Sequence, residues 1–173
     1  DITIAHSGTT TTVTVPSTSL PPPLLVPAGD VILGNNANTA TVLDSTINTN
    51  LNTTNVYVTT GGSGTAPNGG SITVNNDVIV QNSSGAPRQF AMAADTNISV
   101  AYGAKIQGST GSPLTVRMSA GKMNPDGTVI TAGNLDMQGN IKSFGGDVLL
   151  KAAGDRVIGN SGAIVLPDGI TNT

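Results

Sequence analysis

Three short apolar segments recur in the same order along this sequence, and this repeat limits what the chain can fold into. The first segment occurs at Val56–Val58, Phe90–Met92, Val116–Met118 and Val148–Leu150. The second occurs at Ile72–Val74, Ile98–Val100, Val129–Thr131 and Val157–Gly159. The third occurs at Val78–Val80, Lys105–Gln107, Leu135–Met137 and Ile164–Leu166. Each series has a step of about 25 to 35 residues, at which a short strand buries one face by stacking on its copy. The repeat predicts a parallel β-helix, a solenoid with three strands per coil.

The composition favours strands and turns over helices. Only 10% of the residues are charged and 2% are aromatic, and Glu is absent. Asp, Asn and Gly favour turns, whereas Thr and Val favour strands. Hydrophobic residues make up 37% of the chain and stand in spaced β-branched clusters, which argues against disorder. We therefore expect an all-β fold.

Charge and apolar content exclude several classes of partner. The formal net charge is −3 and the isoelectric point is near 4.7, so no overall field attracts nucleic acid. All seven basic residues lie singly from Arg88 onward, and aromatic residues are too few for base stacking. No apolar run is long enough to insert into a membrane. The absence of Cys excludes disulfides and thiolate metal sites.

The repeats divide the chain into two parts. Residues 1–40 are expected to form an irregular β segment packed on the rod, with strands at residues 2–5 and 13–15 and a proline-rich excursion at residues 20–23. Residues 41–173 are expected to form the coils. Because Asp1–Ile4 already reads as a strand, we expect an excised or mature segment of a longer polypeptide. Residues 42–51, with aliphatics at helical spacing, predict one short helix or irregular segment.

The coil boundaries are expected at residues 55–88, 89–113, 114–146 and 147–173. Two Gly-rich or Pro-containing stretches, 61–70 and 121–127, fall between the first and second strands of their coils and predict surface insertions. Turn residues that precede apolar strands are expected to line up between coils, and they are Asp30, Asn55, Asp77, Asn97, Asn140 and Asp147. An antiparallel β-sandwich is the structural alternative.

The narrow interior of such a solenoid suits small and medium aliphatic side chains. The expected interior residues are Val74, Val80, Met92, Val100, Ile106, Val116, Met118, Ile130, Leu135, Ile141, Val148, Leu150, Ile158, Ile164 and Leu166.

Three stretches carry a resemblance to a known family. They read STINTNLNTTNVYVTTGGSGTAPNGGSITVNNDVIV, AMAADTNISVAYGAKIQGSTGSPLTVRMSAG and GNIKSFGGDVLLKAAGDRVIGNSGAIVLPDG. Residues 42–170 resemble the repeat region of filamentous-haemagglutinin-type bacterial exoproteins, the large adhesins exported by two-partner secretion, and the opening DITIAHSG is similar in style. The resemblance implies a right-handed parallel β-helix displayed outside the cell and acting in adhesion, biofilm or contact-dependent interactions. Asn124-Pro125-Asp126-Gly127 departs from the Asn-Pro-Asn motif of that family's secretion domain and reads as a turn.

The polar residues do not form a recognisable catalytic set. His6 is the only histidine and lies beside Ser7, but no nucleophile elbow accompanies the pair. Asp77 with Asp147, or Asp136 with Asp155, could form the carboxylate pair of a glycosidase, although Asp beside Gly or Asn more often shapes a turn. We therefore expect no enzyme activity and assign no catalytic residue.

The remaining motifs also read as structural, so no cofactor or metal is expected. Gly145-Gly146-Asp147 is a faint echo of a calcium-binding repeat and reads as a β-turn. Asn52, Asn82 and Asn97 begin glycosylation sequons in a chain rich in Asn and Thr. Lys142, Lys151 and Arg156 are expected to decorate outer faces and oppose sheet pairing.

Two function classes follow. The first is a structural and adhesive rod of a bacterial cell-surface or secreted exoprotein. Its partners would be a glycan or protein on a host or neighbouring cell, with homo-association through open coil ends. The second is a carbohydrate-binding or carbohydrate-cleaving β-helix domain, which requires facing Asp residues and a nearby Lys or Arg.

Overall fold

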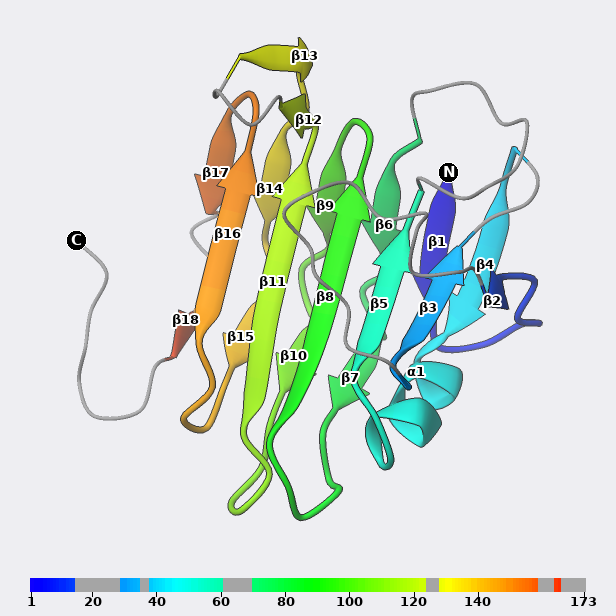
Figure 1. Cartoon of the computed structure of the whole chain (residues 1–173), viewed down its shortest axis with the longest axis vertical. Coiled ribbons are helices and arrows are strands. Elements are labelled where there is room, and N and C mark those ends of the chain that lie inside the picture. Colours follow the sequence, from blue (N-terminus) through cyan, green and yellow to red (C-terminus); the bar gives the residue numbers. More distant parts are fainter. Residues whose placement is uncertain (15–28, 35–37, 61–69, 124–127, 159–163, 166–173) are drawn as a thin grey trace.

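Three β-sheets form the body of the protein in the computed structural model, which describes residues 1–14, 29–34, 38–60, 70–123, 128–158 and 164–165 (Figure 1). Sheet A contains β1 (Ile2–Ala5), β4 (Ala40–Leu43), β6 (Ile72–Val74), β9 (Ile98–Val100), β14 (Leu135–Met137) and β17 (Arg156–Ile158). Sheet B contains β2 (Val13–Thr14), β3 (Val31–Gly34), β5 (Val56–Thr59), β8 (Arg88–Ala94), β11 (Leu114–Ala120) and β16 (Val148–Ala152). Sheet C contains β7 (Ile79–Gln81), β10 (Lys105–Gln107), β15 (Asn140–Lys142) and β18 (Ile164–Val165).

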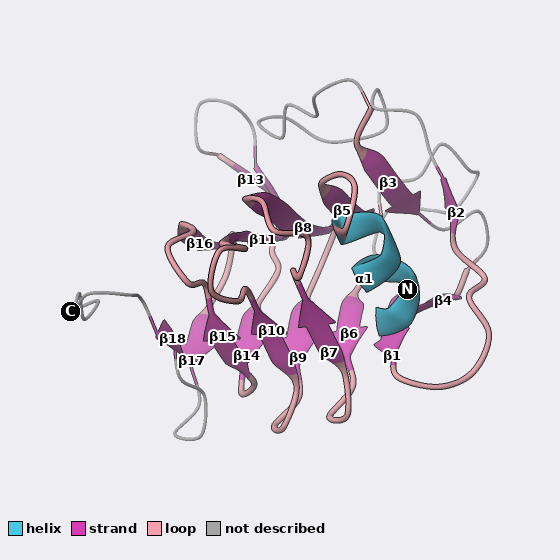
Figure 2. Ribbon diagram, turned by 90° about the horizontal axis from the view of Figure 1, so that it is seen from below, coloured by secondary structure: helices cyan, strands magenta, loops and turns pink. Residues whose placement is uncertain are grey.

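Strands within these sheets pair in parallel, apart from the antiparallel contact of β2 with β3. Over the described part of the chain, the path visits sheet B, then sheet A, then sheet C four times, beginning at β5, β8, β11 and β16. Successive circuits lie side by side along one direction (Figure 2). An all-β fold with parallel sheets is thus confirmed, and the antiparallel sandwich is excluded.

The first predicted series is confirmed to the residue. Val56 pairs with Phe90, Phe90 with Val116, and Val116 with Val148, all in sheet B. Parallel strands in register place side chains of the same type above one another, one strand spacing of about 4.8 Å apart. The interior of sheet B is therefore a set of continuous apolar columns, one of which contains Phe90.

The second and third series are each wrong at their third member, and three other members are one residue out of register. Leu135 pairs with Arg156 and not with Val157. Lys105 pairs with Ile79 and not with Val78, and Ile164 lies in the column of Ile106 and Ile141. Val129–Thr131 is β13, which pairs antiparallel with β12 (Lys122–Met123) in a separate hairpin. Leu135–Met137 takes its place in sheet A beside Ile98–Val100, and Asn140–Lys142 takes the place in sheet C beside Lys105–Gln107. The physical reason is that the insertion after β11 is longer than expected and contains strands of its own.

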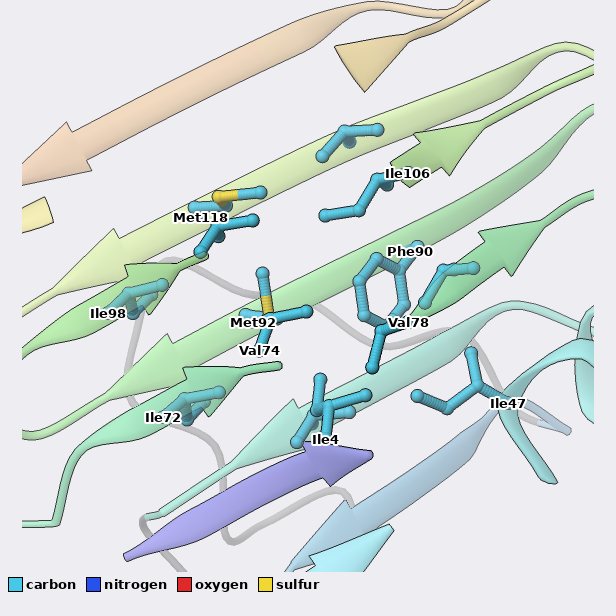
Figure 3. Packing of buried hydrophobic residues seen from close by; sticks show 14 of the residues in the cluster. Ile4, Ile47, Ile72, Val74, Val78, Phe90, Met92, Ile98, Ile106 and Met118 are labelled. Atoms are coloured by element: carbon cyan, nitrogen blue, oxygen red, sulfur yellow. The ribbon is translucent and has the colours of Figure 1, made fainter. Parts of the chain in front are cut away.

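A continuous apolar interior runs between the sheets (Figure 3). Nine of the expected interior residues are buried, namely Val74, Val80, Met92, Val100, Ile106, Val116, Met118, Leu135 and Ile141. Val148 and Leu150 are partly buried against it. Ile130 and Ile158 were wrongly expected there, because Ile130 lies on the hairpin and Ile158 on the last strand of sheet A, and they are 60% and 53% exposed. The side chains of Ile164 and Leu166 lie outside the described set.

The predicted helix is confirmed but begins two residues late. Helix α1 spans Asp44–Leu51, whereas Val42 belongs to β4 and pairs with Ile4 of β1. Ile47 and Leu51 are fully buried and anchor the helix on the interior. The chain thus places a strand in sheet B (β3), a strand in sheet A (β4) and then a helix beside sheet C.

The corrected register gives a stability test. Leu135→Ala should lower the free energy of unfolding by about 2–5 kcal/mol, because it leaves a cavity in the interior. Ile130→Ala should change it by less than about 0.5 kcal/mol, because that side chain is exposed on the hairpin. Urea denaturation followed by circular dichroism measures both. Equal losses in the two variants would contradict the register.

Candidate functional site

The first edge of each sheet is covered, and together these contacts form an N-terminal cap. Strand β7 is the edge of sheet C, and its unpaired backbone groups face α1. The Asp44 carboxylate accepts a hydrogen bond from Ile79 N at 3.0 Å. The Asn48 amide accepts from Gln81 N at 2.8 Å and donates to Ile79 O at 2.9 Å. Two helical side chains thus replace a neighbouring strand.

This replacement works because helix and strand spacings match. Residues four apart on a helix lie on one face and rise about 6 Å. Residues two apart on a strand are about 6.5 Å apart and direct their backbone groups to the same side. Asp44 and Asn48 therefore reach Ile79 and Gln81 simultaneously. The sequence analysis missed both residues. Their spacing of four places both side chains on one helix face, but it does not identify the strand that they bind.

Threonines cover the edge of sheet A. Thr41 O of β4 accepts from Thr11 N at 2.7 Å, and Thr41 N donates to Thr11 Oγ1 at 2.8 Å. Leu43 N donates to Thr10 Oγ1 at 3.2 Å, and Thr10 Oγ1 is 3.0 Å from Thr46 Oγ1 of α1. In sheet B the antiparallel strand β2 covers β3. Backbone groups that would otherwise template another chain are satisfied at this end.

His6 is attached to the cap, and not to Ser7. Its Nδ1 lies 2.9 Å from Asp44 Oδ2, the same oxygen that accepts from Ile79 N. Asp44 is buried, whereas the His6 side chain is 58% exposed. The hydrogen bond to Asp44 and the charge of Asp44 raise the pKa of His6 above 6.5, with a smaller contribution from Asp77. His6 therefore supports Asp44 from the solvent side.

Asp and Asn side chains form ladders across the turns, and of the six predicted residues Asp30, Asn55 and Asn97 take part in them. Asp30 Oδ1 accepts from Asn55 N at 3.3 Å, and Asn55 Oδ1 accepts from Gln89 N at 2.8 Å. In sheet A, Asn97 Oδ1 accepts from Asn134 N at 2.9 Å, and Asn134 Oδ1 accepts from Asp155 N at 3.0 Å. Each side chain thus secures the backbone at the equivalent position of the next circuit.

Tyr57 closes a polar cluster on the outward side of sheet B. Its hydroxyl donates to Asp30 Oδ2 at 3.3 Å and accepts from Gln89 Nε2 at 2.9 Å. Burial, together with the negative charge and hydrogen bond of Asp30, raises the pKa of Tyr57 to about 12. The phenol stays neutral and joins three strands, which is a structural role.

Of the two carboxylate pairs considered for catalysis, Asp77 and Asp147 lie in different sheets and circuits, whereas Asp136 and Asp155 lie on or beside the neighbouring strands β14 and β17. Asp77 precedes β7 of sheet C in the first circuit, whereas Asp147 precedes β16 of sheet B in the fourth. Asp136 accepts from Gln138 Nε2 at 3.1 Å, and Asp155 N is held by the Asn134 side chain. Across the described ranges, no group of three or more His, Cys, Asp or Glu residues could hold a metal ion.

The Gly145-Gly146-Asp147 motif belongs to the tight turn between β15 and β16. Phe144 and Gly145 have φ angles of 54° and 103°, in the left-handed region. A Cβ on Gly146 would overlap the backbone of Leu114. These glycines are therefore explained by close packing of neighbouring circuits.

The sequon asparagines and the basic residues have distinct surroundings. Asn82 is buried, and its Nδ2 donates to Ala86 O and Pro113 O, both at 2.8 Å. Asn52 and Asn97 are exposed. Lys142 and Lys151 are exposed on strands, and Arg156 Nη1 donates to Leu150 O at 3.2 Å. Asn82 is thus a structural side chain of the turn after β7.

The β12–β13 hairpin projects beyond the ends of sheets A and B (Figure 1). Its side chains Val129 and Ile130 are 52% and 60% exposed. Lys122 Nζ lies 3.0 Å from Asp95 Oδ1, and that carboxylate side chain is only 9% exposed. The ion pair ties the hairpin to the turn after β8, so the exposed apolar side chains of β13 stand on an anchored base.

Comparisons of this chain with protein-family models, with curated proteins and with solved structures gave no match. Within the described residues, no helix combines the length and apolar character needed to cross a membrane.

The side-chain cap on β7 can be tested at Asn48. Asn48→Ala removes two hydrogen bonds to the edge strand and should lower the free energy of unfolding by about 1–3 kcal/mol. Ser45→Ala, on the exposed side of the same helix, is the matched control and should be neutral within about 0.5 kcal/mol. Urea denaturation measures both, and a neutral Asn48→Ala variant would contradict the cap.

The His6–Asp44 contact predicts a pH dependence of stability. Because the folded-state pKa of His6 is raised, its contribution is complete below pH 6.5 and is lost as the pH rises through the folded-state pKa. His6→Gln, which does not titrate, should remove this part of the dependence. Thermal unfolding of both proteins between about pH 5.5 and 8.5 measures it. Parallel curves for the two proteins would refute the contact.

Proposed function

We propose that this chain is a rigid segment of a bacterial cell-surface or secreted exoprotein, built as a right-handed parallel β-helix with three strands per coil. The observation that carries the proposal is the repeated passage through sheets B, A and C with equivalent residues paired in register. A stack of this kind adds length with every circuit and contacts only its neighbours, as in solenoid proteins.

The adhesive part of the proposal concerns what the rod presents. The β12–β13 hairpin carries two exposed apolar side chains and is held by a largely buried ion pair at its base. Apolar side chains exposed on a projecting element are available to the surface of a partner. The partner would be a glycan or protein on a host or neighbouring cell, outside the bacterium. The resemblance of residues 42–170 to filamentous-haemagglutinin-type exoproteins supports this setting.

A structural role is favoured over catalysis because several polar side chains already form hydrogen bonds or ion pairs within the fold. Asp30, Asp44 and Asp95 are engaged by a turn, the helical cap and Lys122 respectively. Tyr57 is buried and neutral. These residues bind the backbone and neighbouring side chains, and these contacts stabilise the rod.

The adhesive role is tested on arrays of immobilised glycans and extracellular matrix proteins. The chain should bind at least one class, and Val129→Ser/Ile130→Ser should reduce that binding about tenfold or more, because it removes the exposed apolar side chains of β13. Tyr102→Ser, at another exposed position on a turn, is the matched control and should bind like the original chain. Glycan cleavage by the chain would favour the carbohydrate-active alternative instead. Binding of the hairpin variant equal to that of the original chain would contradict the proposed role of the hairpin.

A further inference from the structure

The two ends of the stack differ in how their edges are treated. At the N-terminal end, α1, β2 and residues 10–12 cover the first edges of the three sheets. At the other end, β16, β17 and β18 are the last strands of sheets B, A and C (Figure 2). There Leu149, Val157 and Ile158 are 47%, 54% and 53% exposed. Among the described residues, no further strand lies beyond β16, β17 and β18, so their outer edges are the ones considered for strand addition.

The backbone of β16 defines which groups are available. Val116 N donates to Asp147 O, and Ala153 N donates to Ala120 O, so residues 147, 149, 151 and 153 face β11. Alternation then directs the N–H and C=O groups of Val148, Leu150 and Ala152 toward the outer edge. The side chains of Asp147, Leu149 and Lys151 share the outward face and are exposed.

We propose that β16 pairs antiparallel with β16 of a second copy of this chain, about a two-fold axis at Leu149. In this register Val148 lies opposite Leu150 of the second copy, and the N–H and C=O groups of both residues face the outer edge, as a hydrogen-bonded antiparallel pair requires. Leu149 meets its own copy on the axis. An isologous edge contact of this kind is closed and self-complementary.

Charge complementarity selects this register over its neighbours. It sets Asp147 of each copy opposite Lys151 of the other, so two equivalent ion pairs flank the Leu149 contact. Shifting the axis by one residue, to Leu150, would set Lys151 against Leu149 and leave Asp147 facing Ala153. The outward face of β16, with Asp147, Leu149 and Lys151 in order, is therefore complementary to the same face of a second copy related by the two-fold axis.

Arg156 opposes the pairing. It lies in sheet A opposite Leu135, in the column that contains Ile2, Ile72 and Ile98, where the earlier circuits carry interior aliphatics. Its guanidinium donates to Leu150 O, a carbonyl that the second copy needs. An inward-position charge at an edge is a known brake on strand addition. Association must displace this contact, so the dimer is reversible.

The same geometry limits the assembly to two copies. A two-fold axis perpendicular to the stack reverses its direction, so the open end of each copy is used once and the capped ends point outward. A head-to-tail filament would need the edges that α1, residues 10–12 and β2 already cover. The proposed dimer rests on the rod-like stack of the proposed function and specifies the end, strand and register of self-association. It does not depend on the adhesive role.

Sedimentation equilibrium of the full 173-residue chain, up to about 1 mM, tests the proposal with a charge exchange. The original chain should form a dimer. Asp147→Lys and Lys151→Asp should each weaken it about tenfold or more, because each creates two like-charge pairs. The double variant should restore it. Lys105→Asp, an outward lysine in the middle of sheet C, should have no effect.

A second variant removes the hydrogen bond from Arg156 to Leu150 O that opposes the pairing. Arg156→Gln should strengthen dimerisation about tenfold, since the guanidinium no longer competes for Leu150 O. Monomers in both the original chain and Arg156→Gln, a dimer indifferent to the charge exchange, or assemblies larger than two would each overturn the proposal. Unchanged far-ultraviolet circular dichroism in these variants would leave the fold and the proposed function standing, so the two failures are distinguishable.

Discussion

In-register pairing of equivalent strands is the interaction on which the rest of the structure depends. Each strand of sheets A and C has only a few residues and could not hold an interior side chain alone. Pairing places Val74 beside Val100 and Val100 beside Met137, so each buries its neighbour's flank. Because the columns are built from contacts between adjacent circuits, the insertion after β11 is accommodated without breaking them. The chain leaves at Gly121 and returns at Gly133, where a Cβ would overlap Thr96 O.

A stack of this kind has to be stopped, and the N-terminal end shows how ordinary side chains do it. Asp44 and Asn48 supply the acceptor and donor atoms that a strand beside β7 would supply. A helix at the third position of its circuit satisfies the edge, yet offers no new edge to a further strand. Thr10–Thr12 cover β4 in the same way. The hydroxyls of Thr10 and Thr11 accept from backbone N–H groups of the strand, and two backbone N–H groups donate to Thr41 O. Both devices place hydrogen-bonding groups where an incoming chain would need them.

The sequence predicted the pairing register of β5, β8, β11 and β16 to the residue, because each carries a clear apolar pattern. It misplaced residues 129–131, since a local hairpin and a sheet strand share the same β-branched composition. Asn134 before Leu135 repeats Asn97 before Ile98 and was the better marker, because the Asn97 side chain binds Asn134 N. The cap at Asp44 was beyond prediction, since its partner Ile79 is 35 residues away and is recognised through the backbone. The position of Arg156 in an otherwise aliphatic column became visible only once the register was known.

The turn ladders give the stack a direction that its sheets alone do not. Asp30, Asn55, Asn97 and Asn134 each accept a hydrogen bond from the equivalent backbone position of the following circuit. In these four contacts the side-chain acceptor points toward the C-terminal end, while the donor comes from the circuit that follows. In sheet B this series begins at Asp30, just before β3, whose edge is covered by β2. At the other end the equivalent residues are Asp147 and Asp155, two carboxylates that have no later described circuit to bind. The chemical difference between the two ends thus arises from chain direction itself, repeated once per circuit.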